Sequence, residues 1–475
     1  MLNLAGSYAI LARSECQTQS QLIENKGLMA TELKQAKVWE RLAQYYSHVF
    51  YRPDLTGLRV ALSVYCSHRL IGENPVWMFL IGDSSTGKTS QIVEPMAHLP
   101  LVSQMGIINE KTFINAYDKD GENVEEGKGK GLLFDLKGKE PFLNGVITWP
   151  EFSVFGRLPE SVRQGLQSQM RMIYDGVLPH RLGNNREITW KGKVSMVAGT
   201  TQEGFNAAWG SQGDLGDRFL IYRMQREWDD GDSLAMVKKV EQNMGKMREI
   251  RDKQKGLIYE LVEGLELGRS GLEFGSGGLP IGAITLLLCK LRQSATWDKY
   301  LKGIVDIGSV EKPGRIMNQA YQLGRGSAML DRRGKMGLED LKLVTRVMID
   351  TMPQERWDVV KRVYVAEREG EGATDTGLIQ AMKVGMAKGR IRMVIDELVA
   401  IGVLSGERAQ RENGKYKFRR VKLSEKIREL MNETFKYKAL VRAHLGENSG
   451  ENLNVTRGKK WLTHDQVSNS DWSKP

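Results

Sequence analysis

The sequence predicts an α/β protein: a phosphate-binding-loop (P-loop) core with a parallel sheet, an α-helical lid and a C-terminal winged helix. Two observations predict the core. Between residues 76 and 226, short apolar runs typical of buried strands alternate with amphipathic helical stretches. The first run, residues 76–81, leads directly into nine residues that contain the pattern G-x-x-x-x-G-K-T: Gly82, Asp83, Ser84, Ser85, Thr86, Gly87, Lys88, Thr89 and Ser90.

The loop after residue 81 has the chemistry of a nucleotide site. Gly82 and Gly87 allow positive φ, so that successive backbone N–H groups can point at phosphates bound at the N-terminus of the next helix. Lys88 would reach the β- and γ-phosphates, and Thr89 would bind Mg²⁺. A Gly/Ser turn that matches by chance is the alternative, but an apolar run precedes the loop and helix-forming residues 91–98 follow it.

The amino-acid composition limits the kinds of protein that this chain can be. At 475 residues the chain is long enough for about three domains, and 41% hydrophobic with 27% charged residues is ordinary for a soluble globular protein. A net charge of +11 favours polyanionic partners such as nucleic acid. Three widely spaced cysteines (Cys16, Cys66 and Cys289) argue against a disulfide framework or a zinc ribbon. Without a long apolar run or the basic start of a signal peptide, we expect a cytoplasmic protein with no membrane segment.

Changes in periodicity and composition divide the chain into six segments. Residues 234–267 are interpreted as one long amphipathic helical stretch, and the lid that contains them as all-α. The expected segments are a poorly ordered N-terminus (1–30), a helical collar (31–75), the nucleotide-binding core (76–226), the α-helical lid (227–352), the winged helix (353–425) and a C-terminal helix with a disordered tail (426–475).

Further elements are expected between residues 145 and 199 of the core. Residues 145–147 and 193–199 predict buried strands, and residues 159–174 predict a helix. Residues 177–190 predict a hairpin, because the turn residues Gly183-Asn184-Asn185 separate its two halves.

A nucleotide-hydrolysing site needs a carboxylate at the end of a neighbouring buried strand, to hold the Mg²⁺ shell and polarise water. Glu151, which follows Trp149-Pro150, is the favoured candidate, and Asp135 competes with it. Most such sites carry an acidic pair, whereas Pro150 leaves Glu151 as a single acid, so that the separate catalytic base is missing or displaced. The alternative is that Glu151 is an ordinary surface residue at a strand end.

Two further polar positions stand at strand ends. Thr200 and Thr201 end a buried strand and would place a hydroxyl beside the γ-phosphate, although two threonines are also ordinary at a strand end. Arg218 stands on a turn before an apolar strand. A surface salt bridge to Asp214 or Asp217 is the plain alternative for Arg218.

This order of features resembles an AAA+ ATPase: phosphate loop, acid-tipped strand, helix, hairpin, Thr-tipped strand and an Arg-Phe pair before a helical lid. The hairpin is similar to that of the pre-sensor-hairpin group, which includes minichromosome-maintenance helicases and superfamily-three viral helicases. The resemblance covers about residues 55–350. Three runs also resemble ATP-binding proteins of phages and mobile elements: Tyr174-Asp175-Gly176, Trp190-Lys191-Gly192-Lys193 and Gly216-Asp217-Arg218-Phe219.

Carried onto this chain, the resemblance implies ATP and Mg²⁺ as cofactors, with Lys88 and Thr89 as their ligands. It makes Thr200 the first sensor and Arg218 the finger that reaches the γ-phosphate of a neighbouring subunit. Arg315 matches the lid arginine of the second sensor, and residues 337–350 resemble the end of such a lid. It also implies a homo-oligomeric ring, a hexamer.

Basic residues at two places are candidates for nucleic-acid contact. His180, Arg181 and Arg186 flank the turn of the predicted hairpin, and in a ring such tips would project into the central pore. There they would grip single-stranded DNA through its phosphates, in a salt-sensitive and sequence-independent way. A solvated basic turn is the alternative.

The C-terminal module is the second place. Residues 374–382 and 387–402 predict two helices, and a basic ribbon around Asn413-Gly414 follows them, which is the outline of a winged helix. Protein docking is the alternative role of such a module. The helix would present Lys388, Arg390 and Arg392 to a DNA groove, and the ribbon would offer Arg408, Arg411, Lys415, Lys417, Arg419 and Arg420 to the backbone.

These features together predict a ring-forming, ATP-driven DNA motor, a replicative helicase of a phage or mobile element, that moves a basic hairpin along single-stranded or forked DNA. Two alternatives stay open: a helicase loader or replication initiator without processive unwinding, and a nucleotide-dependent regulatory or defence ATPase that acts on proteins. No primase, nuclease or polymerase signature accompanies the loop, so a primase or initiator would be a separate chain.

Overall fold

A five-stranded, all-parallel sheet lies at the centre of the molecule, in the order β2-β3-β6-β1-β7. Its strands are β1 (Trp77–Ile81), β2 (Val102–Gln104), β3 (Asn144–Trp149), β6 (Lys193–Thr200) and β7 (Phe219–Arg223). The computed structural model describes residues 34–70, 74–114, 131–133, 144–181, 187–209, 218–224, 230–265, 278–298, 300, 303–370, 373–382, 386–410 and 416–445. The expected α/β class with a parallel sheet is confirmed.

Alternating side chains of the strands feed two hydrophobic layers. On β1, Met78 and Leu80 join the core beneath α2 (Leu55–His68), whereas Trp77, Phe79 and Ile81 join the core on the other face. That second face is covered by α4 (Ser153–Gly156), α5 (Glu160–Tyr174) and α6 (Gln202–Trp209). Both faces of the sheet are therefore buried, which explains why its strands are nearly continuous apolar runs.

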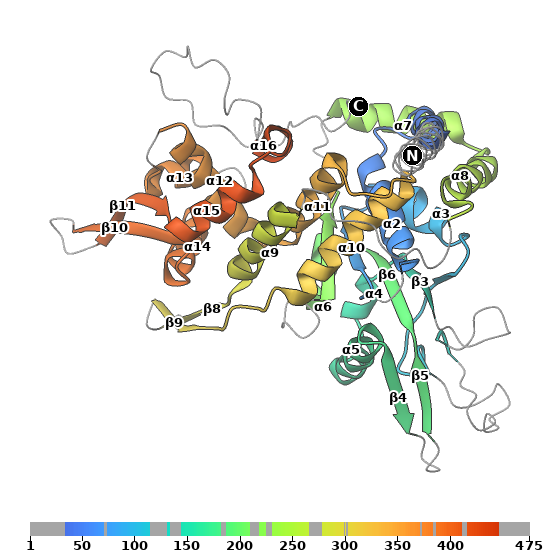
Figure 1. Ribbon diagram of the computed structural model, residues 1–475, viewed down its shortest axis with the longest axis horizontal. Helices are drawn as coiled ribbons and strands as arrows, with labels where there is room; N and C mark the ends of the chain where they lie inside the picture. The colour runs from blue at the N-terminus through green and yellow to red at the C-terminus, as the bar shows by residue number, and fades with distance from the viewer. Residues whose placement is uncertain are drawn as a thin grey trace, which may run out of the picture.

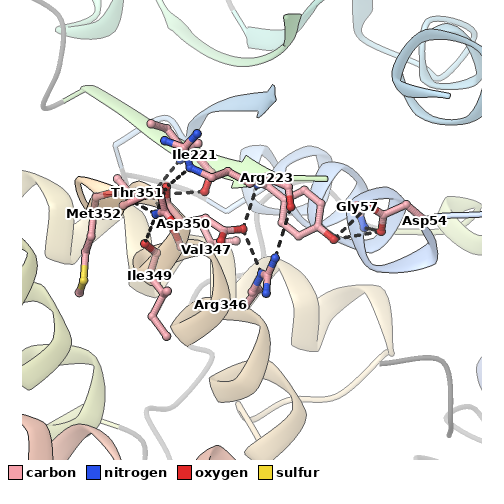
Figure 2. A network of polar contacts seen from close by, with 12 residues as sticks. Asp54, Gly57, Ile221, Arg223, Arg346, Val347, Ile349, Asp350, Thr351 and Met352 are labelled. Carbon is pink, nitrogen blue, oxygen red and sulfur yellow. Dashed lines mark hydrogen bonds and ion pairs between the residues drawn. The ribbon is translucent and has the colours of Figure 1, made fainter. Parts of the chain in front are cut away.

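The outer edge of β7 is closed by side chains rather than by a sixth strand (Figure 2). The Ile221 N–H donates to Thr351 Oγ1 (2.8 Å), and the Arg223 N–H donates to Asp350 Oδ2 (2.9 Å). Both acceptors stand at the end of α11 (Leu338–Thr351). Because an unpaired strand edge exposes backbone donors and acceptors, these bonds both end the sheet and attach α11 to it.

Helices from α7 to α11 form a helical unit next to the sheet: α7 (Asp230–Asn243), α8 (Met247–Val262), α9 (Gly278–Arg292), α10 (Gly314–Leu330) and α11. The sequence-based expectation of one helical stretch over 234–267 is wrong, because the chain breaks at Gly245, which has a φ of +80°. The unit is also not all-α: β8 (Ala295–Asp298) and β9 (Gly303–Ile307) form an antiparallel hairpin. The β-branched residues in these strands favour this conformation.

Helix α10 packs along α2, so the residues before the sheet and the helical unit share one core (Figure 1). Gly326 makes the close crossing possible, because a Cβ at this position would overlap the carbonyl oxygen of Ser63. Gln35, in the helix over residues 34–49, donates from Nε2 to Leu330 O (2.8 Å) at the end of α10. In the described part of the expected helical collar, the helix over residues 34–49 and α2 are both present.

The C-terminal unit consists of three helices, a hairpin and two further helices. Its α15 packs against α9 and its α16 against α11. The expected pair of helices and the basic ribbon are confirmed, and Ala373 adds a single bridge to Val421 of the ribbon. The elements are α12 (Gln354–Arg368), α13 (Asp375–Ala381), α14 (Lys388–Ala400), β10 (Leu404–Gln410), β11 (Tyr416–Leu423), α15 (Glu425–Thr434) and α16 (Lys438–Leu445).

Two expectations on the termini, a poorly ordered residue range 1–30 and a disordered tail after about residue 446, fall outside the described residues. Across the described ranges, no helix combines the length and apolar character needed to cross a membrane.

Replacing Thr351 with Val removes the hydroxyl that pairs with β7 and keeps nearly the same volume. The Ile221 N–H would then be buried without its partner, so we expect the free energy of unfolding to fall by about 1–3 kcal/mol. Chemical denaturation followed by circular dichroism measures this change. Thr345→Val, six residues earlier in the same helix, is the matched control, and an equal loss in both variants would contradict the edge-closing role.

His68 lies buried in the last turn of α2, and burial, with Lys193 and Arg69 nearby, lowers its pKa to about 3. A folded-state pKa below the unfolded value makes folding favour the neutral ring. The stability from this group is therefore present above about pH 6.5 and is lost as the pH falls.

We expect His68→Leu to reduce the pH dependence of unfolding between about pH 6 and pH 4 by about 1.4 kcal/mol per pH unit, which corresponds to one proton. Denaturation curves at a series of pH values give this slope. The control variant is His48→Leu, which makes the same replacement at an exposed histidine. An unchanged slope in His68→Leu would contradict the buried, neutral state of His68.

Candidate nucleotide site

The loop after β1 folds around the ammonium of Lys88. Lys88 Nζ donates to the carbonyl oxygens of Gly82 and Asp83, both at 2.6 Å. Ser85 and Gly87 take positive φ values of 66° and 91°, which turn the backbone twice within three residues. Left-handed residues of this kind form concave nests of N–H groups that suit anions, and the side chains of Asp83, Ser84 and Ser85 are exposed.

Lys88 is itself largely buried, and this burial lowers the pKa of its ammonium. Glu151 and Asp83 oppose the shift through their negative charge. Glu151 is therefore within electrostatic reach of Lys88, although the two residues lie 63 positions apart in the chain. A cation held in this way is attractive to a polyphosphate.

A short helical segment, Lys88–Val93, begins at the end of the loop and continues into α3 (Glu94–Met96). Its turns are wide, since the Glu94 N–H donates to the carbonyl of Thr89, five residues earlier. Such wide turns are frequent at functional sites. Thr89 is exposed at the first turn, where the predicted Mg²⁺ ligand would have to stand, and Ser90 follows it partly buried.

Glu151 leaves the carboxyl end of β3 next to β6. The Phe152 N–H donates to Gly199 O (2.8 Å), and a Cβ at Gly199 would lie only 2.8 Å from Pro150 O, so this approach requires glycine. The Glu151 carboxylate is exposed and accepts a hydrogen bond from Ser153 Oγ. Asp135, the competing candidate, lies outside the described residues.

Thr200 ends β6 and pairs with Ile81, the last residue of β1. The Gly82 N–H donates to Thr200 O (3.2 Å), so this buried threonine lies directly beside the start of the loop. Its hydroxyl donates to the Thr201 carbonyl (3.2 Å), whereas Thr201 Oγ1 accepts from the Gly204 N–H in the first turn of α6. The two threonines therefore differ: Thr201 caps α6, whereas Thr200 lies beside the loop through its backbone and uses its hydroxyl in a bond to the next residue.

Arg218 lies at the amino ends of the parallel strands (the amino edge of the sheet), whereas the loop lies at their carboxyl ends (the carboxyl edge). Arg218 immediately precedes β7, and Phe219 pairs with Trp77, the first residue of β1. Five strand residues at ~3.3 Å each separate it from the carboxyl edge by roughly 16 Å. Arg218 pairs with Asp175 at 3.4 Å, while Asp214 and Asp217, the partners considered from the sequence, lie outside the described residues.

Arg315 joins Arg218 at this edge. The guanidinium groups of Arg218 and Arg315 lie 5.7 Å and 5.8 Å from the ring centroid of Tyr174. The Tyr174 ring meets Trp77 edge-on, with centroids 5.2 Å apart. The structure thus gathers two residues that the sequence assigned separately, around an aromatic residue that sequence reasoning had not assigned to the site.

The hairpin predicted to contact DNA is present as β4 (Val177–Arg181) and β5 (Glu187–Lys191). In its antiparallel register, the backbone of Arg181 stands opposite that of Glu187. It projects away from the sheet (Figure 1). The side chains of His180 and Arg181, and residue Arg186 as a whole, lie outside the described residues.

On α14, Lys388 and Arg392 are exposed. Arg390 instead binds Glu355 (2.5 Å) and Glu397 (3.3 Å), so its charge is partly used within the C-terminal unit. Lys415 and the side chains of Arg408, Lys417 and Arg419 lie outside the described residues, as does Arg411, and Arg420 is exposed.

Sequence reasoning missed Arg223, the last residue of β7. Its side chain donates to Gln202, two residues after Thr200, and to the Asp350 carbonyl (3.1 Å). Burial lowers the pKa of this guanidinium, and the negative charge of Asp350 opposes that shift. No local pattern could reveal Arg223, because its partners come from distant parts of the chain.

The loop has the features that fit a nucleotide phosphate: a glycine-dependent cradle, a buried lysine and a threonine at the first helical turn. Within the described ranges, no cluster of three or more His, Cys, Asp or Glu side chains forms a metal site on its own. Thr89 and Glu151 remain the residues that would hold Mg²⁺ together with the nucleotide.

No protein-family model matches this chain, and a search among curated proteins gives no match. The function must therefore be inferred from the residues themselves.

Gly199→Ala would push the end of β3 away from β6 and so displace Glu151 from Lys88. We expect a fall in the free energy of unfolding of about 1–3 kcal/mol and a nucleotide dissociation constant at least tenfold higher, measured by titration with a fluorescent ATP analogue. The control is Gly165→Ala on α5, where a Cβ would meet nothing within 4 Å. Equal binding by both variants would contradict the proposed packing of the acid.

Proposed function

We propose that this chain is an AAA+ ATPase that works as a ring of identical subunits and uses ATP to move along DNA, as a replicative helicase of a phage or mobile element does. One observation carries the proposal: Arg218 lies roughly 16 Å from the carboxyl edge of its own sheet, and Arg315 lies at the same tyrosine ring, that of Tyr174. An arginine pair at this distance cannot reach a nucleotide bound by its own loop. It can serve the loop of a neighbouring subunit.

The sheet order supports the first half of such a site. β6, which ends in Thr200, lies between β1, which leads into the loop, and β3, which leads to Glu151. Loop, sensor and acid therefore converge at one edge, where ligands of parallel α/β sheets bind. Bound ATP would supply phosphate-bond energy there; Lys88 would hold the β- and γ-phosphates, Thr89 and Glu151 would hold Mg²⁺, and Thr200 would be the sensor.

The remaining units support the proposal by their element order. The helices after β7, attached through α11, suit the role of a lid. The C-terminal order of helix, bridge, two helices and antiparallel ribbon supports a winged helix as the proposed fold of this unit. There Lys388 and Arg392 would face DNA phosphates, and the β4–β5 hairpin would be the moving grip. A primase or initiator would be a separate partner.

Subunit mixing tests the arginine role. Lys88→Ala and Arg218→Ala should each lower ATP hydrolysis by about 10³-fold or more. A one-to-one mixture should recover roughly a quarter of the wild-type rate, because random assembly places an intact loop beside an intact arginine at that frequency. Phosphate release is the measurement, with and without single-stranded DNA.

Each outcome decides a separate point. An arginine that served its own loop would give no recovery in the mixture, which would contradict the ring. Stimulation by DNA that is lost in Arg181→Ala/Arg186→Ala supports the motor. Hydrolysis indifferent to DNA, together with recovery in the mixture, would contradict the helicase and favour a loader, an initiator switch or an ATPase that acts on proteins.

A further inference from the structure

Helix α7 exposes several apolar side chains to solvent. Leu234, Val237 and Val240 are 57%, 51% and 56% exposed, and Met244, just after the helix, is 73% exposed. At these spacings the four side chains fall on one side of a helix, and we call them the α7 stripe. A surface helix normally turns such a side toward the core.

Polar contacts hold α7 in this orientation. Asp232 is buried and pairs with Arg52 (2.8 Å) and Tyr51 (2.6 Å), and Asn243 donates to Val49 O (2.7 Å). Both ends of the helix are thus fixed to the residues around 49–52. The exposed stripe is therefore a consequence of specific contacts, and contiguous exposed apolar side chains mark interaction surfaces.

A second exposed apolar group lies on the hairpin β8–β9 and the residues after it. Tyr300, Val305, Ile307 and Val310 are 95%, 50%, 43% and 44% exposed, and we call them the hairpin patch. A two-stranded ribbon of this kind gains little stability in water unless something packs on it.

The two surfaces cannot cover each other within one chain. α7 and the β8–β9 hairpin stand at opposite ends of the molecule (Figure 1). Along the sequence, each surface is close to a different half of the nucleotide site. Asp230, at the start of α7, is six residues after Met224, which bonds to Ile81 O beside the loop, whereas Arg315 follows Val310 by five residues.

We propose that the hairpin patch of one copy packs on the α7 stripe of the next copy, in the same contact that brings Arg218 and Arg315 to the neighbouring loop. The inference rests on the proposed function, which requires such a neighbour. Two different surfaces joined head to tail make a heterologous contact, the kind that closes into rings. Specific interfaces bury roughly 800 Å² per partner, so the two patches form the apolar centre of a larger contact.

Charge placed in either surface tests the contact. Val237→Glu and Ile307→Glu should each weaken self-association at least tenfold in sedimentation velocity, with unchanged thermal unfolding. A mixture of the two variants should form dimers and nothing larger, because the intact hairpin of the first fits the intact stripe of the second. Ile107→Glu, at a 93% exposed apolar side chain outside both surfaces, is the control and should assemble like the wild type.

The measurements use Lys88→Ala protein without nucleotide, so that assembly is read independently of hydrolysis. Failure of the mixture to form dimers would overturn the head-to-tail pairing. Unchanged association in Val237→Glu would also overturn it and would point to another occupant, such as residues 1–33 of the same chain or a different protein. Assembly without any ATP hydrolysis in the wild type would contradict the proposed function and leave the interface standing.

Discussion

The junction between β7 and α11 is the interaction on which the rest of the molecule depends. The last strand of the sheet has one side without a neighbouring strand. There its backbone N–H groups donate to Thr351 and to the buried carboxylate of Asp350. Arg346 in turn pairs with that carboxylate at 3.0 Å. Burying such charges is costly unless each has its partners, so α11 is held in one place and one register. The helical unit, and through it the C-terminal unit, is positioned by these bonds.

The same junction lies close to the chemistry. Arg223 contributes its backbone to the sheet edge and its side chain to Gln202, next to Thr200. The carboxyl edge of the sheet is therefore connected to α11 through both the backbone and the side chain of Arg223. The amino edge is built differently, from aromatic rings and two guanidinium groups around Tyr174. The amino and carboxyl ends of a parallel sheet differ in structure. One chain can therefore carry the loop at one end of its sheet and the arginines at the other.

The local sequence pattern was enough to predict the elements with a clear apolar periodicity or turn motif of their own. These are β1 and the loop, α5, the β4–β5 hairpin and β6. The local pattern failed where a local break competed with a long amphipathic pattern, as at Gly245, and where a ribbon was hidden in a segment interpreted as helical, as in β8–β9. The site shows the same division. Lys88 and Thr89 follow from a motif, whereas Tyr174 and Arg223 gain their positions from partners up to 141 residues away along the sequence, Arg315 and Asp350 among them.

Helix α10 has the mechanical form of a lever. Its 17 residues span about 25 Å. Its last third is pinned, by the crossing of Gly326 over Ser63 and by the bond from Gln35 to Leu330, while Arg315 stands near the other end. A tilt of about 5° around Gly326 would move the Arg315 backbone by roughly 1.4 Å, since Arg315 lies 11 positions before Gly326 in the helix. Small rotations of the helical unit would thus be amplified into displacements at the arginine edge.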